Sequence, residues 1–362
     1  MRHTSKLLGV VSTAVLATLG ANAAHAAGTV AGTTITNTAT VNYSVGGVSQ
    51  NAQTASNAVT VDRKVIFTVT GAASTTSVNP GQSGAAAAFT LTNTSNDTLD
   101  FALAAVNQAT GASAAHGGTD AFDMGAFTYY VDTNNNGVYD AGVDTAVTYI
   151  DELAPDTSKT IFVVSSTPLS ATNAQVAGIV LTATAEAGGA AGTQGAVLTA
   201  TTGANTAGVD TVFADGAGAT DSANDGKYSA KGDYTVSAPV LTVQKLSTII
   251  SDPINGTTNP KAIPGAVIEY CIVVSNAAGG ATTSALSIND PLPTQVTYNS
   301  AYGIFVNGTF NGTSCNTDGT AGTAANSSYT AASGSNPAVV AGTLNNVAAS
   351  ASNTLRFRVT IN

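Results

Sequence analysis

The stretch Thr354-Leu355-Arg356-Phe357-Arg358-Val359-Thr360-Ile361 alternates polar and apolar side chains without a break. Successive side chains of a β-strand point to opposite faces of a sheet, so the alternation predicts a strand over this range. Its core face is expected to carry Leu355, Phe357, Val359 and Ile361. Its other face carries Arg356, Arg358 and Thr360, which we expect to point outward.

Short runs of the same kind recur along the chain from residue 33, and helix signals are nearly absent there. Turns rich in Asn, Asp, Gly and Pro separate the runs, which is typical of a β-sandwich. The sequence therefore predicts an all-β protein of tandem immunoglobulin-like β-sandwich domains. Outside residues 27–63, the expected strands are 65–69, 87–92, 127–131, 146–150, 160–164, 178–183, 240–246, 266–274, 285–288, 295–298, 338–344 and 354–361.

Residues 1–26 have the three parts of a secretory signal peptide. Arg2 and Lys6 precede an apolar run over 7–19, which is too short to span a bilayer, and Ala24-His25-Ala26 supplies the small residues of a cleavage site before Ala27. We therefore expect export, with the mature protein outside a bacterial cell or on its surface.

The remaining chain divides into four segments by composition. Residues 27–63 form a β segment with two alternating runs around Gly46-Gly47, too short to bury a core alone. Residues 64–200 and 234–362 are the two expected sandwiches. Residues 201–233 are rich in Gly, Ala and Asp with little apolar mass, and we expect a loop or linker there.

Charge argues against two classes of partner. Removal of residues 1–26 takes away two of the 11 basic residues and none of the 21 acidic ones, so the formal net charge falls from −10 to −12. An acidic surface repels nucleic acid and anionic membranes. No later stretch is apolar enough to span a bilayer, so neither nucleic-acid binding nor membrane insertion is expected.

A family resemblance rests on two neighbouring stretches. Pro264-Gly265-Ala-Val-Ile-Glu-Tyr270-Cys-Ile-Val-Val-Ser-Asn276 is followed by Ile288-Asn-Asp290-Pro-Leu-Pro293. Together they resemble the domain-of-unknown-function eleven repeats of bacterial and archaeal surface proteins, best over 240–362. The resemblance implies an immunoglobulin-like sandwich, an extracellular setting and a structural or adhesive role.

The chain departs from that family pattern at one point. The family's module ends with a further strand carrying Asn and Ala, and the sequence given stops before it, at Asn362. The stretch Ile35-Thr-Asn37-Thr-Ala39-Thr-Val41-Asn-Tyr43 is similar to that strand. It is therefore a candidate to complete the second sandwich, in the same chain or in a neighbouring copy.

A calcium loop is expected at Asp132-Thr-Asn134-Asn-Asn136-Gly137-Val138-Tyr-Asp140-Ala-Gly-Val-Asp144. Ca²⁺ takes six to eight oxygen ligands around a sharp turn, and the spacing of these side chains can wrap one ion. The expected ligands are Asp132, Asn134, Asn136, the carbonyl of Val138, Asp140 and Asp144. An Asn-Gly turn without an ion is the alternative, because turns use the same residues.

Two further pairs of residues are candidates for a cross-link or an ion pair. Cys271 and Cys315 are the only cysteines, and in an oxidising compartment a disulfide between them is expected. Lys245 and Asp290 each share a strand face with apolar residues, which predicts a buried ion pair, or a lysine at the edge of the sandwich that extends its charged end to solvent. The alternative for this pair is an isopeptide cross-link to an Asn beside the acid, for which Asn37 is in phase with the apolar face of its strand.

These features favour a non-enzymatic structural or adhesive surface protein, stabilised by calcium, whose partners are other surface proteins or copies of itself. One alternative is a filament subunit assembled by donor-strand addition. Another is a carbohydrate-binding module, for which the sequence offers one tyrosine cluster: Tyr129, Tyr130 and Tyr139. A single His outside the signal peptide, His116, provides no convincing catalytic set.

Overall fold

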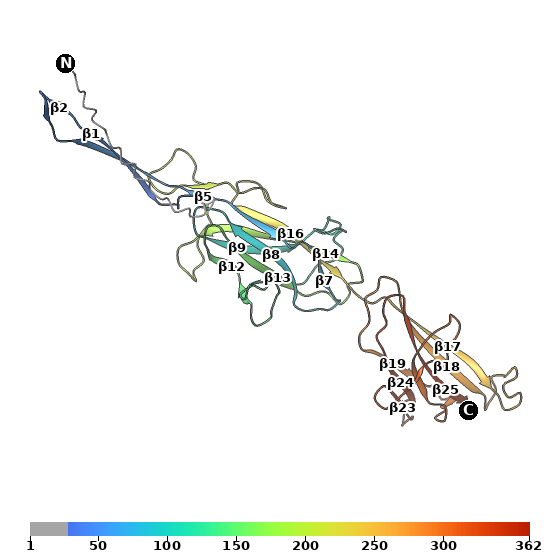
Figure 1. Ribbon diagram of the computed structural model, residues 1–362. Coiled ribbons are helices and arrows are strands. Elements are labelled where there is room, and N and C mark those ends of the chain that lie inside the picture. The colour runs from blue at the N-terminus through green and yellow to red at the C-terminus, as the bar shows by residue number, and fades with distance from the viewer. Residues whose placement is uncertain (1–27) are drawn as a thin grey trace, which may run out of the picture.

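The computed structural model describes residues 28–362, so the expected signal peptide lies outside the described residues. Within 28–362 every regular element is a β-strand, and no helix that could cross a membrane occurs there. A two-stranded ribbon, a first sandwich and a second sandwich follow one another along an extended molecule (Figure 1). The predicted all-β, tandem-sandwich architecture is confirmed.

The ribbon, residues 34–60, projects from one end of the molecule (Figure 1). β1 (Thr34–Val41) pairs antiparallel with β4 (Gln53–Thr60), and the short strands β2 (Ser44–Val45) and β3 (Val48–Ser49) continue it to the tip. Gly46 and Gly47 form the turn, both with positive φ, a conformation that glycine adopts without steric cost. The two alternating runs therefore pair with each other, and β1 does not complete the second sandwich of its own chain.

The first sandwich has two five-stranded sheets. In spatial order, one sheet contains β11 (Thr145–Val147), β10 (Thr128–Val131), β13 (Thr157–Ser165), β8 (Ala85–Asn93) and β6 (Phe67–Gly71). The other contains β12 (Tyr149–Leu153), β9 (Leu99–Asn107), β14 (Val176–Ala187), β16 (Lys227–Val236) and β7 (Thr76–Val78). A short parallel pair, β5 (Arg63–Val65) with β15 (Thr211–Phe213), lies near the ribbon.

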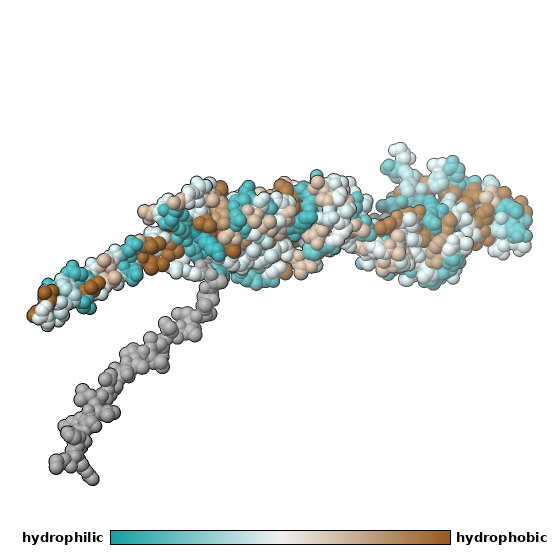
Figure 2. Space-filling model, turned by 90° about the horizontal axis from the view of Figure 1, so that it is seen from above, coloured by the Kyte–Doolittle hydropathy of each residue, from teal (hydrophilic) through white to brown (hydrophobic). Residues whose placement is uncertain are grey.

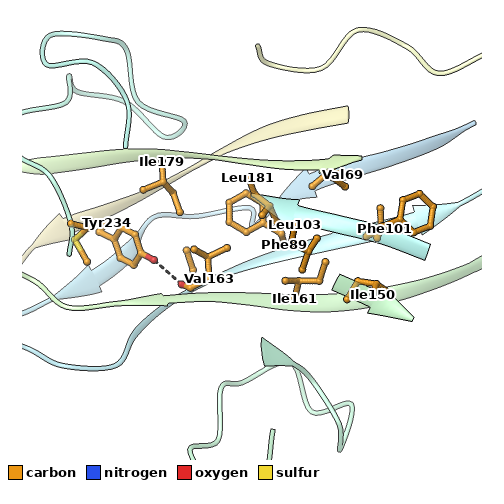
Figure 3. Close-up of a cluster of buried hydrophobic side chains, with 14 of the residues drawn as sticks. Val69, Phe89, Phe101, Leu103, Ile150, Ile161, Val163, Ile179, Leu181 and Tyr234 are labelled. Carbon is orange, nitrogen blue, oxygen red and sulfur yellow. Dashed lines mark hydrogen bonds between the residues drawn. The ribbon is translucent and has the colours of Figure 1, made fainter. Parts of the chain in front are cut away.

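The core lies between these two sheets (Figure 3). Phe67, Phe89 and Phe101 are fully buried, and the Phe67 and Phe101 rings contact each other at 4.8 Å between centroids. The hydroxyl of Tyr234, also fully buried, donates a hydrogen bond to the carbonyl of Val163 on the facing sheet (Figure 3). Burial of each such side chain contributes roughly 1.5–3 kcal/mol, and the hydrogen bond keeps the phenol from being an unpaired buried polar group.

The expected loop or linker over 201–233 is wrong at its C-terminal end, because residues 227–233 belong to β16 and pair with β14. Before them, β15 is the one regular element in the range. One position of β16, Gly232, has to be small. A Cβ added at Gly232 would lie 2.7 Å from the Phe89 ring, so the close approach of strand and ring excludes a larger side chain. The first sandwich therefore extends beyond residue 200 to the end of β16.

The second sandwich has one large and one small sheet. The large sheet contains β17 (Leu241–Ser251), β18 (Val267–Asn276), β25 (Ser352–Ile361), β21 (Ile304–Gly308) and β22 (Thr320–Ala321), with β20 (Val296–Tyr298) also on β25. The small sheet contains β19 (Leu286–Pro291), β24 (Val339–Leu344) and β23 (Ser327–Thr330). Leu355, Phe357 and Val359 of β25 are fully buried between the sheets, as their alternation predicts.

The outward placement of Arg356 is wrong. Its side chain is on the opposite face from Leu355 but is only 4% exposed, because Tyr302 and Phe305 cover it. The guanidinium lies 3.5 Å from the carboxylate of Glu269. A period of two identifies which residues share a face of the sheet, and the loops that cover the face decide whether it is buried.

Candidate functional site

The two sandwiches share a strand order, and the comparison exposes a gap in the second. β17, β18, β25, β21 and β22 follow the order of β6, β8, β13, β10 and β11. β19 and β24 pair as β9 and β12 do. In the first sandwich the antiparallel pair β14–β16 extends the second sheet from β9 and contacts β6. Within 28–362 no counterpart of β14 or β16 stands beside β19.

The gap leaves two strand edges and part of the core uncovered. We name this region the seam, defined by β17, β19 and the side chains Leu241, Val243, Lys245, Leu286, Ile288 and Asp290. Among the described residues, β17 pairs with β18 alone and β19 with β24 alone. Val243 is 66% exposed, although its partner Val274 across the strand pair is buried. At the matching places in the first sandwich, Phe67 and Val69 are buried.

The ribbon at the other end of the molecule has one apolar face. Residues directly opposite each other in an antiparallel pair share a face. One face therefore carries Ile35 with Val59, Asn37 with Asn57, Ala39 with Ala55, and Val41 with Gln53. The other face carries mostly hydroxyl side chains. Ile35, Val41 and Val59 are each more than half exposed, and Figure 2 shows apolar residues spaced along this projecting arm.

Lys245 and Asp290 meet inside the seam. Lys245 Nζ lies 2.6 Å from Asp290 Oδ1 and 4.6 Å from the centroid of the Tyr270 ring. The Asp290 side chain is 7% exposed and that of Lys245 is 41% exposed, so the pair is half-buried and open on the lysine side. Asn37 lies on the ribbon and is not brought near this pair within one chain.

The expected disulfide between Cys271 and Cys315 is confirmed. It joins β18 to the segment after β21 on the outer face of the large sheet. Both cysteines are buried, with Val273 fully buried beside them and Leu246 and Phe310 packed against them. The bridge therefore covers a small second core on the side of the sheet away from the seam.

The loop expected to hold calcium is closed by its own hydrogen bonds. The carboxylate of Asp132 accepts N–H groups of Asn136 and Gly137, and that of Asp144 accepts those of Thr133 and Asp140. The side-chain amides of Asn134 and Asn136 donate to Asp140, and these hydrogen bonds lower the pKa of the Asp140 carboxyl. Calcium would require both amides to turn their oxygens inward, so its binding stays a prediction.

The structure brings together two further groups of titratable side chains. His116 Nδ1 lies 2.8 Å from Asp233 Oδ1, and this hydrogen bond raises the pKa of His116 above 6.5. Asp100, Asp151 and Glu152 cluster near the hairpin after β14, where each accepts at least one backbone N–H group. Asp151 and Glu152 are consecutive in the sequence and could be identified there as a carboxylate pair, to which the pairing of β12 with β9 adds Asp100. His116 and Asp233 have no local motif, because they are 117 positions apart.

The tyrosine cluster is used for packing. The rings of Tyr130 and Tyr139 lie 4.9 Å apart, and Tyr139 also contacts Phe162. The hydroxyl of Tyr129 accepts the N–H of Ala105. All three tyrosines are half-buried, so sugar binding at this cluster stays a prediction without a flat exposed ring to support it.

No family model and no curated protein matches the chain, so the family resemblance stays a prediction. Among solved structures, it is similar to the T6 backbone pilin of Streptococcus pyogenes, at 11% identity and a TM-score of 0.24 over 83% of this chain. The match spans about half, 54%, of the pilin chain.

Two further structures match at similar levels. The CupB6 tip adhesin of Pseudomonas aeruginosa has 13% identity and a TM-score of 0.27, with 83% of this chain and 89% of that chain covered. A protein of Corynebacterium diphtheriae described as membrane anchored has 11% identity and a TM-score of 0.20, with 91% and 89% covered. All three TM-scores lie below 0.5, so the argument on function rests on the chain's own geometry.

Proposed function

We propose that this protein is an extracellular structural subunit that assembles head to tail, with the ribbon of one copy completing the second sandwich of the next. The observation that carries the proposal is the open seam between β17 and β19, which lacks the two antiparallel strands that close the first sandwich. The ribbon is a pair of antiparallel strands of the same kind. Repetition of the contact would build a filament, because the two surfaces differ and lie at opposite ends.

The ribbon matches the seam in hydrogen bonding. An added strand pairs its backbone with a free sheet edge, and both edges of the seam are free among residues 28–362. β1 and β4 each contain eight residues, against six in β19 and 11 in β17. One ribbon can therefore supply strands that span the seam.

The ribbon also matches the seam in polarity. Its apolar face would lie over Leu241, Val243 and Ile288, while its hydroxyl face would stay in solvent. Ile35 and Val59 are exposed in the single chain, and full burial of each contributes roughly 1.5–3 kcal/mol. A separate protein is not needed to explain this exposed apolar surface.

The test uses one charge at each surface. Ile35→Glu blocks the ribbon and Val243→Glu blocks the seam; both positions are exposed, so both variants should fold. Thr36→Glu and Gln244→Glu are the matched controls, one residue away on the opposite faces. Each protein is unfolded in urea, refolded and measured by light scattering. The wild type and the controls should form oligomers, and each blocked variant should stay monomeric.

A mixture of the two blocked variants gives the sharper result. One competent seam and one competent ribbon remain in the mixture, so it should form a dimer that grows no further. A wild type that stays monomeric after refolding would refute the proposal. Oligomers that form equally in all variants would refute the ribbon and seam as the contact.

A further inference from the structure

The seam contains a carboxylate with an unused oxygen. Oδ1 of Asp290 is paired with Lys245, whereas Oδ2 is buried and has no hydrogen-bond partner among the described residues. Asp290 as a whole is 6% exposed. Buried polar atoms in folded proteins nearly always have a partner, so this oxygen points to a donor that arrives with the missing strand.

The strand registers show where Lys245 would lie relative to that missing strand. Asn93 ends β8 and Asn276 ends β18, and each donates its side-chain amide to two carbonyl oxygens near the end of the facing strands. Asn93 is paired with Phe67 and Asn276 with Leu241. Gly71 and Lys245 follow these two partners by the same four positions.

In the first sandwich, Gly71 is where the closing strand comes nearest. A Cβ added there would collide with the backbone carbonyl of Lys231 in β16. Because Lys245 has a side chain at the matching position, an incoming strand must lie farther from β17 than β16 lies from β6, with the lysine side chain against it. The ammonium group is already held toward that strand by Asp290 and by the Tyr270 ring.

The ribbon has asparagines at the centre of its apolar face. Asn37 and Asn57 are opposite each other, flanked by Ile35 with Val59 on one side and by alanines on the other. Asn57 Oδ1 accepts the N–H of Ala58. The side chain of Asn37 makes no hydrogen bond within residues 28–362, so its carboxamide is the free one of the pair.

We propose that Lys245 of one copy forms an isopeptide bond with Asn37 of the next, and this rests on the proposed function. The Lys245 amine attacks Cγ of Asn37, so the new bond joins Nζ to Cγ. The bond from Cγ to the amide nitrogen breaks, and ammonia leaves. Counted from the ammonium form, the lysine and the carboxamide give the amide and one ammonium ion, so no oxidant or other reactant is consumed.

Asp290 is the catalytic residue of this step, because it contacts the reacting amine. Its Oδ1 takes a proton from Lys245, which frees the amine to attack. Its unpaired Oδ2 is available to the Asn37 amide and can deliver a proton to the leaving nitrogen. The docked ribbon would exclude water from the seam and so strengthen both interactions.

The test is denaturing gel electrophoresis and mass spectrometry of the assembled wild-type protein. Boiling in detergent should leave a ladder of covalent oligomers, and peptide mapping should find Lys245 and Asn37 peptides joined with a loss of about 17 Da, the mass of ammonia. Lys245→Arg, Asp290→Asn and Asn37→Ala should each abolish the ladder. Thr38→Ala, the matched control next to Asn37 on the hydroxyl face of the ribbon, should keep it.

Light scattering on the same samples separates this proposal from the proposed function. If light scattering finds oligomers that boiling in detergent separates into monomers, the cross-link is refuted and strand addition is still supported. The absence of oligomers before denaturation would overturn strand addition. A ladder retained by Lys245→Arg or Asn37→Ala would also overturn the assignment of the bond.

Discussion

Removal of the Cys271–Cys315 bridge should destabilise the second sandwich alone. The perturbation is the double replacement Cys271→Ser and Cys315→Ser, which leaves no unpaired thiol because the chain has no other cysteine. The two residues are 44 positions apart, and the cross-link of a loop of this length lowers the entropy of the unfolded chain by an amount worth about 4 kcal/mol. This is a large share of the roughly 5–15 kcal/mol that stabilises a typical domain.

The assay must distinguish the two sandwiches, because a global probe would mix them. Hydrogen exchange read by mass spectrometry in increasing urea follows each sandwich through its own peptides. Peptides from β18 and β25 should open at lower urea in the variant, by an amount equivalent to about 3–4 kcal/mol. Peptides from β8 and β13, in the first sandwich, are the internal control and should not change.

Two outcomes would refute this reasoning. If the β18 and β25 peptides open at the same urea concentration in both proteins, the bridge adds nothing to the stability of the second sandwich. If the first-sandwich peptides shift equally, the two sandwiches unfold as one unit, and the bridge does not stabilise the second sandwich alone. Reduction of the wild type should reproduce the effect of the double variant.

Three other changes have definite expected outcomes. Tyr234→Phe leaves the buried carbonyl of Val163 without its donor and should lower the stability of the first sandwich by about 1–3 kcal/mol in urea unfolding; no change would show that water replaces the hydroxyl. The Asp233 hydrogen bond raises the pKa of His116, so its stabilisation is complete below pH 6.5 and is lost as pH rises through the folded-state pKa. The stability gap between wild type and His116→Gln should therefore narrow from pH 6 to pH 8, and a constant gap would contradict the pairing. If the 132–144 loop binds calcium, the ion should raise the melting temperature of the wild type but not of Asp144→Asn, whereas equal curves with and without calcium would end that prediction.

Local patterning predicts the strands that have a continuous period of two and fails where pairing decides. The 354–361 strand and the strands of the ribbon were predicted because each carries its alternation and turn residues in sequence. β9 is absent from the expected strands, although Leu99 and Phe101 are fully buried in it, because the alternation ends at Leu103 and the run Ala104-Ala105-Val106 follows. Most of β16 lies in the expected linker because Ala230 and Gly232, which share the face of Tyr234, add little apolar mass, and the contact of Gly232 with the Phe89 ring requires a small residue there.

Part of the candidate site could also be predicted from the alternation of apolar and polar residues along its strands. Lys245 and Asp290 were paired from the faces they share with apolar residues, and the structure places them in contact. The 41% exposure of the Lys245 side chain agrees with the expected lysine at the sandwich edge, and it arises because no strand within 28–362 covers the seam beside β19. His116 and Asp233 lie 117 positions apart, and no sequence spacing relates them.

The all-β class, the tandem order and the disulfide partners could be predicted from the sequence alone, whereas the pairing of the two ribbon strands with each other is a finding of the structure. The class, the order and the disulfide follow from side-chain period, turn chemistry and a count of two cysteines, all of which are local or numerical. Only the tertiary structure decided that the first sandwich is closed by β14 and β16, and that the second has an open seam at the end of the molecule away from the ribbon. Those facts depend on which strands lie side by side, and backbone hydrogen bonds between strands join residues that are distant in the chain.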